Sequence, residues 1–109
     1  MQLEKELRGD AILIRVLADR IDAAAAIEFK NSMADACKDA PDRVVLDLSS
    51  VTFLDSSGLG AVVAIMKLLG TGRKLELASL MPNVEKVFRL TRMDKIFTIH
   101  TTAEDAFTA

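Results

Sequence analysis

Apolar and polar positions along the chain recur with the periods of strands and helices in turn. Residues 2–7 and 11–17 are separated by a turn at 8–10 that contains Gly9, and together they predict a β-hairpin. In 11–17, Ile12, Ile14 and Val16 fall on one face and Leu13 and Leu17 on the other, so both faces of this strand are expected to be covered. The chain therefore begins with a strand pair, one member of which lies deep in the sheet.

Further apolar runs predict strands at 43–48, 74–80 and 96–101. Helices are predicted from a cap at Asp22 to about Lys38, at 57–69, at 83–92 and, in a short final piece, at 102–107. The inner stripe of the first helix consists of Ala26, Phe29, Met33, Cys37 and Ala40. This alternation predicts a single α/β domain over 1–109, with a mixed four- to five-stranded sheet and about four helices as cover.

Composition narrows the class of protein. Half of the 109 residues are apolar, which is enough for a core, and the net charge is −2. That charge gives no broad attraction to nucleic acid or anionic lipid, so we expect no nucleic-acid partner and no direct membrane insertion. The one cysteine, Cys37, cannot form an internal disulfide, and residues 1–10 lack the apolar core of a signal peptide. A cytoplasmic protein is expected.

The stretch FLDSSGLG, residues 53–60, carries the candidate chemistry between a predicted strand and a predicted helix. A nucleophilic serine needs a neighbouring base, and the one histidine, His100, belongs to a separate strand. The stretch matches neither the hydrolase elbow nor the glycine-rich phosphate-binding fingerprints. One cysteine and one histidine without clustered carboxylates do not predict a metal site. We therefore expect no catalytic residues, no metal and no cofactor.

Ser56 and Ser57 lie where the helix is predicted to begin, and two interpretations remain open. The first N–H groups of a helix lack intrahelical partners, so a phosphate there, free or attached to a serine, would find donors and the positive end of the helix dipole. Asp-Ser-Ser before an apolar helix is also an ordinary capping sequence, with Gly58 and Gly60 serving close packing.

The helix predicted at 57–69 is apolar on two sides. With roughly 100° per residue, one face presents Leu59, Val62, Val63, Met66 and Leu69, and the opposite face presents Ala61, Ala64, Ile65 and Leu68. The first face can cover the sheet. The second is either buried against another element or is a partner-binding surface. That surface would also include, at the start of the helix, Ser57, Gly58, Leu59 and Gly60.

The stretch RVVLDLSSVTFLDSSGLGAVVAIMKLL, residues 43–69, resembles the signature of STAS domains and, among them, of bacterial anti-sigma-factor antagonists. The likeness consists of a strand of the type VVLDLS, a short loop, and F-x-D-S-S-G-L-G opening a helix. Because chain length and element order also fit, the resemblance covers nearly the whole chain.

This resemblance implies a partner switch. An anti-sigma factor that is also a serine protein kinase binds the unphosphorylated antagonist and so releases its other client. The kinase phosphorylates the first serine of the motif, which weakens binding, and a metal-dependent PPM-type serine phosphatase resets the cycle. By position that serine is Ser56, with Ser57 as the second candidate. Asp55 and Asp22 also match and are expected beside it, among the partner-binding residues. The protein would be a kinase substrate and not itself an enzyme.

The chain departs from the family pattern after its second strand. Residues 19–22, Asp-Arg-Ile-Asp, stand where the family has Gly-Glu-Leu-Asp or similar, so that Arg20 lies beside the loop that meets the kinase. The sequence thus predicts a phosphorylation-switched anti-anti-sigma regulator. The alternative is a non-phosphorylated STAS docking subunit of a membrane transport assembly, and nucleotide binding ranks third.

Overall fold

A five-stranded mixed sheet carries the fold in the computed structural model, which describes residues 1–108. In spatial order its strands are β1 (Leu3–Arg8), β2 (Ala11–Val16), β4 (Arg43–Asp47), β6 (Lys74–Ala78) and β7 (Thr98–His100). β1 pairs antiparallel with β2, and the remaining neighbours pair in parallel. The strands β2, β4 and β6 are buried on both faces, which is why they are nearly continuous apolar runs.

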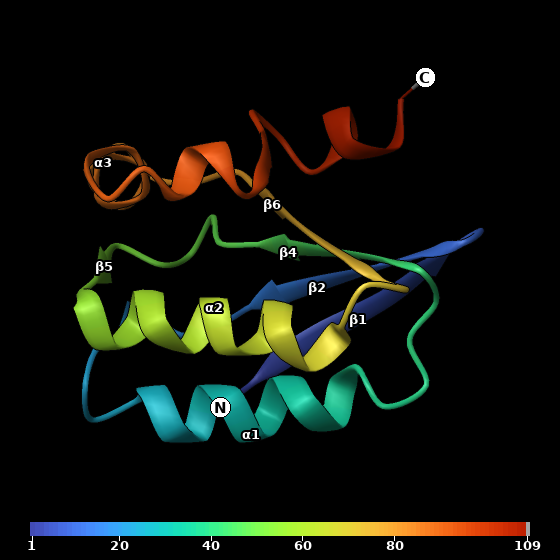
Figure 1. Ribbon diagram of the computed structural model, residues 1–109, viewed down its shortest axis with the longest axis horizontal. Helices are drawn as coiled ribbons and strands as arrows, with labels where there is room; N and C mark the ends of the chain where they lie inside the picture. Colours follow the sequence, from blue (N-terminus) through green and yellow to red (C-terminus); the bar gives the residue numbers. More distant parts are fainter. Residues whose placement is uncertain (109) are drawn as a thin grey trace.

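The helices between the strands are α1 (Ala26–Ala36), α2 (Ser56–Leu69) and α3 (Pro82–Leu90). Two 3₁₀ turns complete the chain: η1 (Met93–Lys95) follows α3, and η2 (Glu104–Phe107) follows β7. α1 and α2 lie side by side on one side of the strands with their N-terminal ends at the same end of the molecule, whereas α3 and the C-terminal turns lie above the strands (Figure 1). Within residues 1–108, no helix combines the length and the apolarity that crossing a bilayer requires.

The predicted α/β domain with a mixed sheet is confirmed, with three local corrections. The final helix predicted at 102–107 is the 3₁₀ turn η2. The helix expected directly after Asp22 begins at Ala26, because residues 23–25 form a turn in which the N–H groups of Ala25 and Ala26 donate to the Asp22 carbonyl. A two-stranded parallel ribbon, β3 (Arg20–Ile21) with β5 (Phe53–Leu54), was not predicted from the sequence at all.

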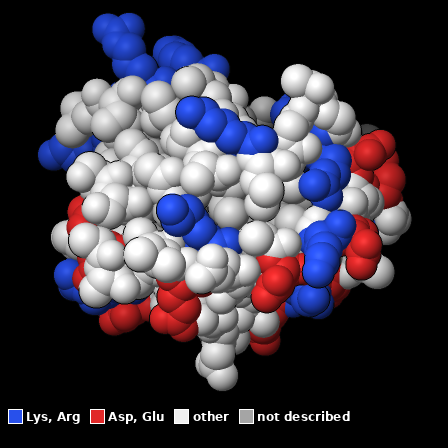
Figure 2. Space-filling model, turned by 60° about the horizontal axis from the view of Figure 1, so that its bottom comes forward, with Lys and Arg blue, Asp and Glu red and all other residues white. Residues whose placement is uncertain are grey.

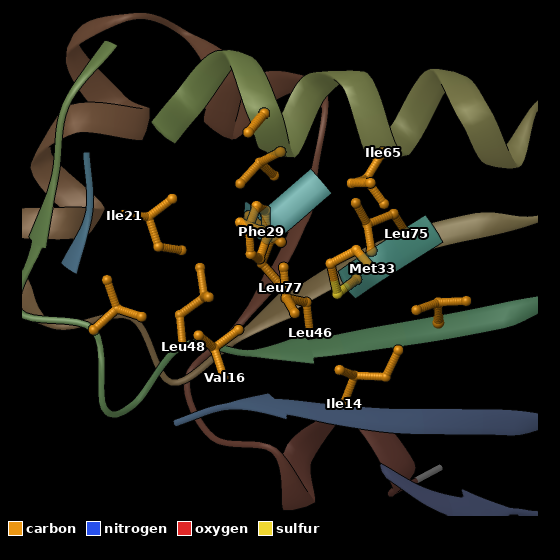
Figure 3. Close-up of a cluster of buried hydrophobic side chains, with 14 of the residues drawn as sticks. Ile14, Val16, Ile21, Phe29, Met33, Leu46, Leu48, Ile65, Leu75 and Leu77 are labelled. Atoms are coloured by element: carbon orange, nitrogen blue, oxygen red, sulfur yellow. The ribbon is translucent and has the colours of Figure 1, made fainter. Parts of the chain in front are cut away.

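The main core lies between the sheet and α1 and α2. Phe29 and Met33 of α1, which the predicted stripe included, are fully buried. Figure 3 shows Ile65 pointing from α2 toward Leu75 of β6, with Phe29 and Met33 lying among side chains of the strands. Val84 of α3 also belongs to this cluster. The main core therefore includes side chains from α1, α2, α3 and the central strands of the sheet.

The opposite face of the sheet carries a second, smaller cluster under the C-terminal segment. Its buried members are Leu13, Val45, Ala78, Ala103 and Ala106. Beside it lies an ionic group centred on the buried Glu76: Arg43 donates to both carboxylate oxygens of Glu76 (2.7 and 2.9 Å), and Nε2 of His100 is 2.7 Å from Glu76 Oε1. Arg43 also donates to the carbonyl of Ala106 (2.7 Å), which fastens η2 onto the sheet.

Candidate functional site

The short ribbon of β3 and β5 brings together two loops that are some thirty residues apart in sequence. Arg20 pairs with Phe53, and Ile21 pairs with Leu54. The N–H groups of Thr52 and Phe53 both donate to the carbonyl of Asp19 (2.8 and 3.2 Å). As a result, the segment before α1 lies directly against the segment before α2.

Asp55 joins these two segments and begins α2. Its Oδ1 accepts a hydrogen bond from the N–H of Gly58 (3.0 Å), which is a helix N-cap contact, and its Oδ2 accepts from the N–H of Ala23 (3.3 Å). One carboxylate therefore satisfies donors of both loops. The expectation that Asp22 and Asp55 lie close together is met, because Asp22 immediately precedes Ala23.

Gly58 is the point of closest approach between α2 and β3. A Cβ atom built at this position would lie 2.0 Å from the carbonyl oxygen of Ile21, far inside any allowed contact. Gly58 is also buried. Gly58 is therefore not on the surface where a partner contact was expected, and its lack of a side chain lets the start of α2 rest against the ribbon.

Ser56 and Ser57 are the first two residues of α2, and both are exposed. Their backbone N–H groups belong to the first turn, where a helix leaves donors without intrahelical partners. An anion at this end of α2 would also meet the positive end of the helix dipole. The exposed start of α2 therefore has features that favour a bound or attached anion near Ser56 and Ser57.

Arg20 covers the outer side of the ribbon. Its guanidinium carbon lies 4.2 Å from the centre of the Phe53 ring, and its Nε is 3.3 Å from Oδ2 of Asp22. Arg20, together with the N–H of Ala25, holds the pKa of the Asp22 carboxyl below its usual range. Sequence reasoning singled out Arg20 but missed its stacking on Phe53, since the ribbon that pairs the two residues was not predicted.

The two faces of α2 differ from those expected. Ala61 and Ile65, expected on the partner side, are buried in the core and cannot contact a partner in this conformation. The buried stripe consists of Gly58, Ala61, Val62, Ile65 and Leu69. Leu59 and Ala64 are partly exposed, whereas Gly60 and Leu68 are exposed, Leu68 by 55%. The open face of α2 is thus narrower than predicted and turned by part of a helical turn.

The α1 and α2 side of the molecule combines uncharged, basic and acidic areas. In Figure 2, which brings this side forward, uncharged atoms cover much of the centre, Lys and Arg side chains lie at the top, within the centre and on the right, and acidic side chains gather toward the lower and right margins. Phe53 contributes further apolar surface and is 37% exposed. An exposed apolar area beside a polar loop is typical of a protein-binding surface.

Sequence reasoning also missed a residue that anchors the loop before α2. The side-chain amide of Asn83, near the start of α3, donates to the carbonyl of Thr52. This contact ties the third helix to the ribbon, so that all three α-helices of the described chain meet the site near their first turns. The sequence signals this contact only weakly, through an asparagine that follows Pro82 at the start of a predicted helix.

A sheet that is parallel apart from its antiparallel first strand, and a DSSGLG stretch that begins the central helix, define a small α/β domain. The STAS domain family model matches residues 2–106, and the chain belongs to this family. It is 31% identical to BtrV of Bordetella bronchiseptica over 92% of this chain and 87% of that protein. It is 26% identical to the anti-sigma-F factor antagonist RsfB of Mycobacterium tuberculosis, over 91% of this chain and 81% of RsfB.

The same family appears among solved structures. An anti-sigma factor antagonist from Mycobacterium paratuberculosis superposes with a TM-score of 0.86 and 27% sequence identity, covering 97% of this chain and 90% of that one. Nearly full coverage of both chains means that they share the same fold over almost their whole lengths.

Proposed function

We propose that this protein is an anti-sigma-factor antagonist whose binding to a serine-kinase anti-sigma factor is switched by phosphorylation of Ser56. The observation that carries the proposal is an exposed serine at the first turn of α2, next to a carboxylate that fixes two loops. Relatives named anti-sigma factor antagonists support the regulatory role. The protein acts as a kinase substrate rather than as an enzyme, and a PPM-type serine phosphatase resets it.

The switch follows from charge. Phosphorylation adds about −1.5 to −2 charges at neutral pH. Asp22 and Asp55 already lie at the site, so a partner that packs over Ser56 would have to bury the phosphate beside two carboxylates. Repulsion and desolvation then oppose binding, while the helix N-terminus keeps the free protein folded. We expect the affinity to fall by roughly ten- to hundredfold, which corresponds to about 1.4–2.8 kcal/mol.

The partner surface is the exposed part of the site, revised by the structure. Its residues are Asp22, Phe53, Asp55, Ser57, Leu59, Gly60, Ala64 and Leu68. It excludes Gly58, Ala61 and Ile65, which are buried. The unphosphorylated surface offers apolar contacts from α2 and the ribbon, so burial of Leu68 and Phe53 supplies affinity that the added charge would oppose.

The test is phosphopeptide mass spectrometry on protein recovered from its native host, with and without phosphatase inhibition. We expect phosphate on Ser56 in the wild type and in a Ser57→Ala strain, and none in a Ser56→Ala strain. The Ser56→Ala protein should retain the kinase in pull-downs, whereas Ser56→Asp should retain it weakly. Modification of Ser57 alone would move the site by one residue. No phosphate under any growth condition would contradict the switch and favour a constitutive docking subunit.

A further inference from the structure

Resting on the proposed function, which makes Ser56 the modified residue, we propose that Arg20 is the intramolecular acceptor of the phosphate. In the unphosphorylated protein Arg20 is paired with Asp22. After phosphorylation the guanidinium exchanges Asp22 for the phosphate oxygens, so modification changes the partner surface at two points. The phosphate adds charge at Ser56, and Asp22 loses its cation.

The first argument is the position of Arg20. It belongs to β3, which pairs in parallel with β5, and its direct partner there is Phe53, three residues before Ser56. The guanidinium stacks on the Phe53 ring at 4.2 Å, and 54% of the Arg20 side chain is exposed. Stacking holds the arginine stem on the outer side of the ribbon while its N–H groups stay available for an anion.

The second argument is a short path of contacts from Arg20 to Ser56. Arg20 Nε lies 3.3 Å from Asp22 Oδ2. The next residue, Ala23, donates its N–H to the Asp55 carboxylate at 3.3 Å, and Asp55 directly precedes Ser56. Arg20 and Ser56 therefore belong to one contiguous group of contacts, and the proposed exchange is a rotation of the Arg20 side chain from Asp22 toward position 56.

The third argument is the charge balance of the two segments that form the site. Residues 19–22 and 53–60 contain three carboxylates, Asp19, Asp22 and Asp55, and a single cation, Arg20. A phosphate dianion brings three strong acceptor oxygens and matches the two-pronged donor geometry of a guanidinium. An exposed Arg–Asp pair is weak, so the phosphate competes with Asp22 for the same cation on favourable terms.

The test uses the full chain with phosphoserine installed at position 56 by genetic encoding, and measures the second pKa of that phosphate by ³¹P NMR titration. A neighbouring cation favours the dianion and lowers this pKa. We expect the value to rise by roughly 0.3–0.7 unit in Arg20→Gln, which removes the charge and keeps a stem over Phe53. Arg20→Lys should give an intermediate value, because it keeps the charge without the fork.

The matched control is Arg89→Gln, which removes an exposed arginine paired with Glu85 on α3 and should leave the phosphate pKa unchanged. The Arg20 Nε resonance should also shift with the phosphate titration. Equal phosphate pKa values in the wild type and Arg20→Gln, or an equal shift in the Arg89→Gln control, would overturn the proposal. Because the phosphate is installed without a kinase, this result is independent of whether Ser56 is phosphorylated in the cell, which mass spectrometry decides.

Discussion

Glu76 shows how a single residue can tie the second face of the sheet together. It is 3% exposed and accepts from Arg43 through both carboxylate oxygens, with His100 at hydrogen-bond distance. The Arg43 hydrogen bond and, to a smaller extent, His100 lower the pKa of Glu76 from 4.5 to about 2, against the opposing effect of burial. The buried Glu76 carboxylate stabilises the fold only while it is ionised, because protonation would break its ion pair with Arg43.

Stability should therefore fall in acid through this residue. The folded-state pKa lies below the unfolded value of 4.5, so the contribution of Glu76 is fully present above pH 4.5 and is lost as the pH falls toward 2. The full contribution is about 3 kcal/mol. We expect Glu76→Gln to lower the free energy of unfolding at pH 7 by about 2–3 kcal/mol and to flatten its dependence on pH between 4.5 and 2.

Urea unfolding at a series of pH values measures both effects. Glu85→Gln is the matched control, since Glu85 is an exposed carboxylate paired with Arg89 on α3. The control should follow the wild-type curve. A Glu76→Gln curve parallel to that of the wild type would show that the ionic group beneath η2 does not govern acid stability.

At the scale of elements, α2 is the part of the molecule whose environment was hardest to predict. The helix is apolar on two sides, so a period of 3.6 residues fits more than one buried stripe. Ile65 was assigned to the open side and lies in the core, because the helix is turned until Gly58 rests on Ile21. This contact joins Gly58 to the backbone of Ile21, almost forty residues earlier in the chain. The spacing of apolar residues within the helix therefore cannot predict it.

Two glycines of α2 should respond oppositely to the same substitution. Gly58→Ala places a Cβ 2.0 Å from the Ile21 carbonyl oxygen, so α2 or the ribbon must shift, and we expect a loss of about 2–4 kcal/mol or failure to fold. Gly60→Ala meets nothing within 4 Å and should stabilise the helix by about 0.5–1 kcal/mol. Thermal unfolding of both variants checks the pair, and a tolerated Gly58→Ala would refute the close approach.

Other elements were predictable because their signals are local. The apolar runs at 43–48 and 74–80 and the stripe containing Phe29 and Met33 identify strands and a helix from neighbouring residues alone. The predicted ends differ from the structure by at most about three residues, and the largest difference is at the start of α1, where residues 23–25 form a turn. The ribbon of β3 and β5 could not be predicted, since each strand has two residues and is defined only by its partner.

At the scale of the whole molecule, the two faces of the sheet have different surroundings. Its α1 and α2 side forms the main core and presents the candidate switch site at one end, whereas its other side is closed by the C-terminal segment. Arg8 donates to Glu104, and its guanidinium lies 4.8 Å from the centre of the Phe107 ring. The last residues described therefore belong to the fold and cover apolar surface of the central strands.

A charged side chain placed between η2 and the sheet should detach η2 from the sheet. Ala106 is buried in the second cluster, next to Leu13 and Val45, and Ala106→Asp would place a carboxylate there without a partner. We expect a loss of about 2–4 kcal/mol in the free energy of unfolding. Thr102→Asp is the control, because it adds the same charge at an exposed position where the side chain can still accept from the Asp105 N–H. Equal stability of the two variants would argue against a structural role of η2.

The bridge made by Asp55 has a consequence for how the site can be recognised. A peptide covering residues 50–62 would reproduce the letters DSSGLG but would lack the N–H of Ala23 and the neighbouring Asp22. Under the proposed function, the binding determinant is a discontinuous epitope assembled from two segments that are distant in sequence, rather than a linear motif. An enzyme or partner that binds this epitope would distinguish folded molecules from nascent or denatured chains. Only folded protein would then be phosphorylated or bound by the partner.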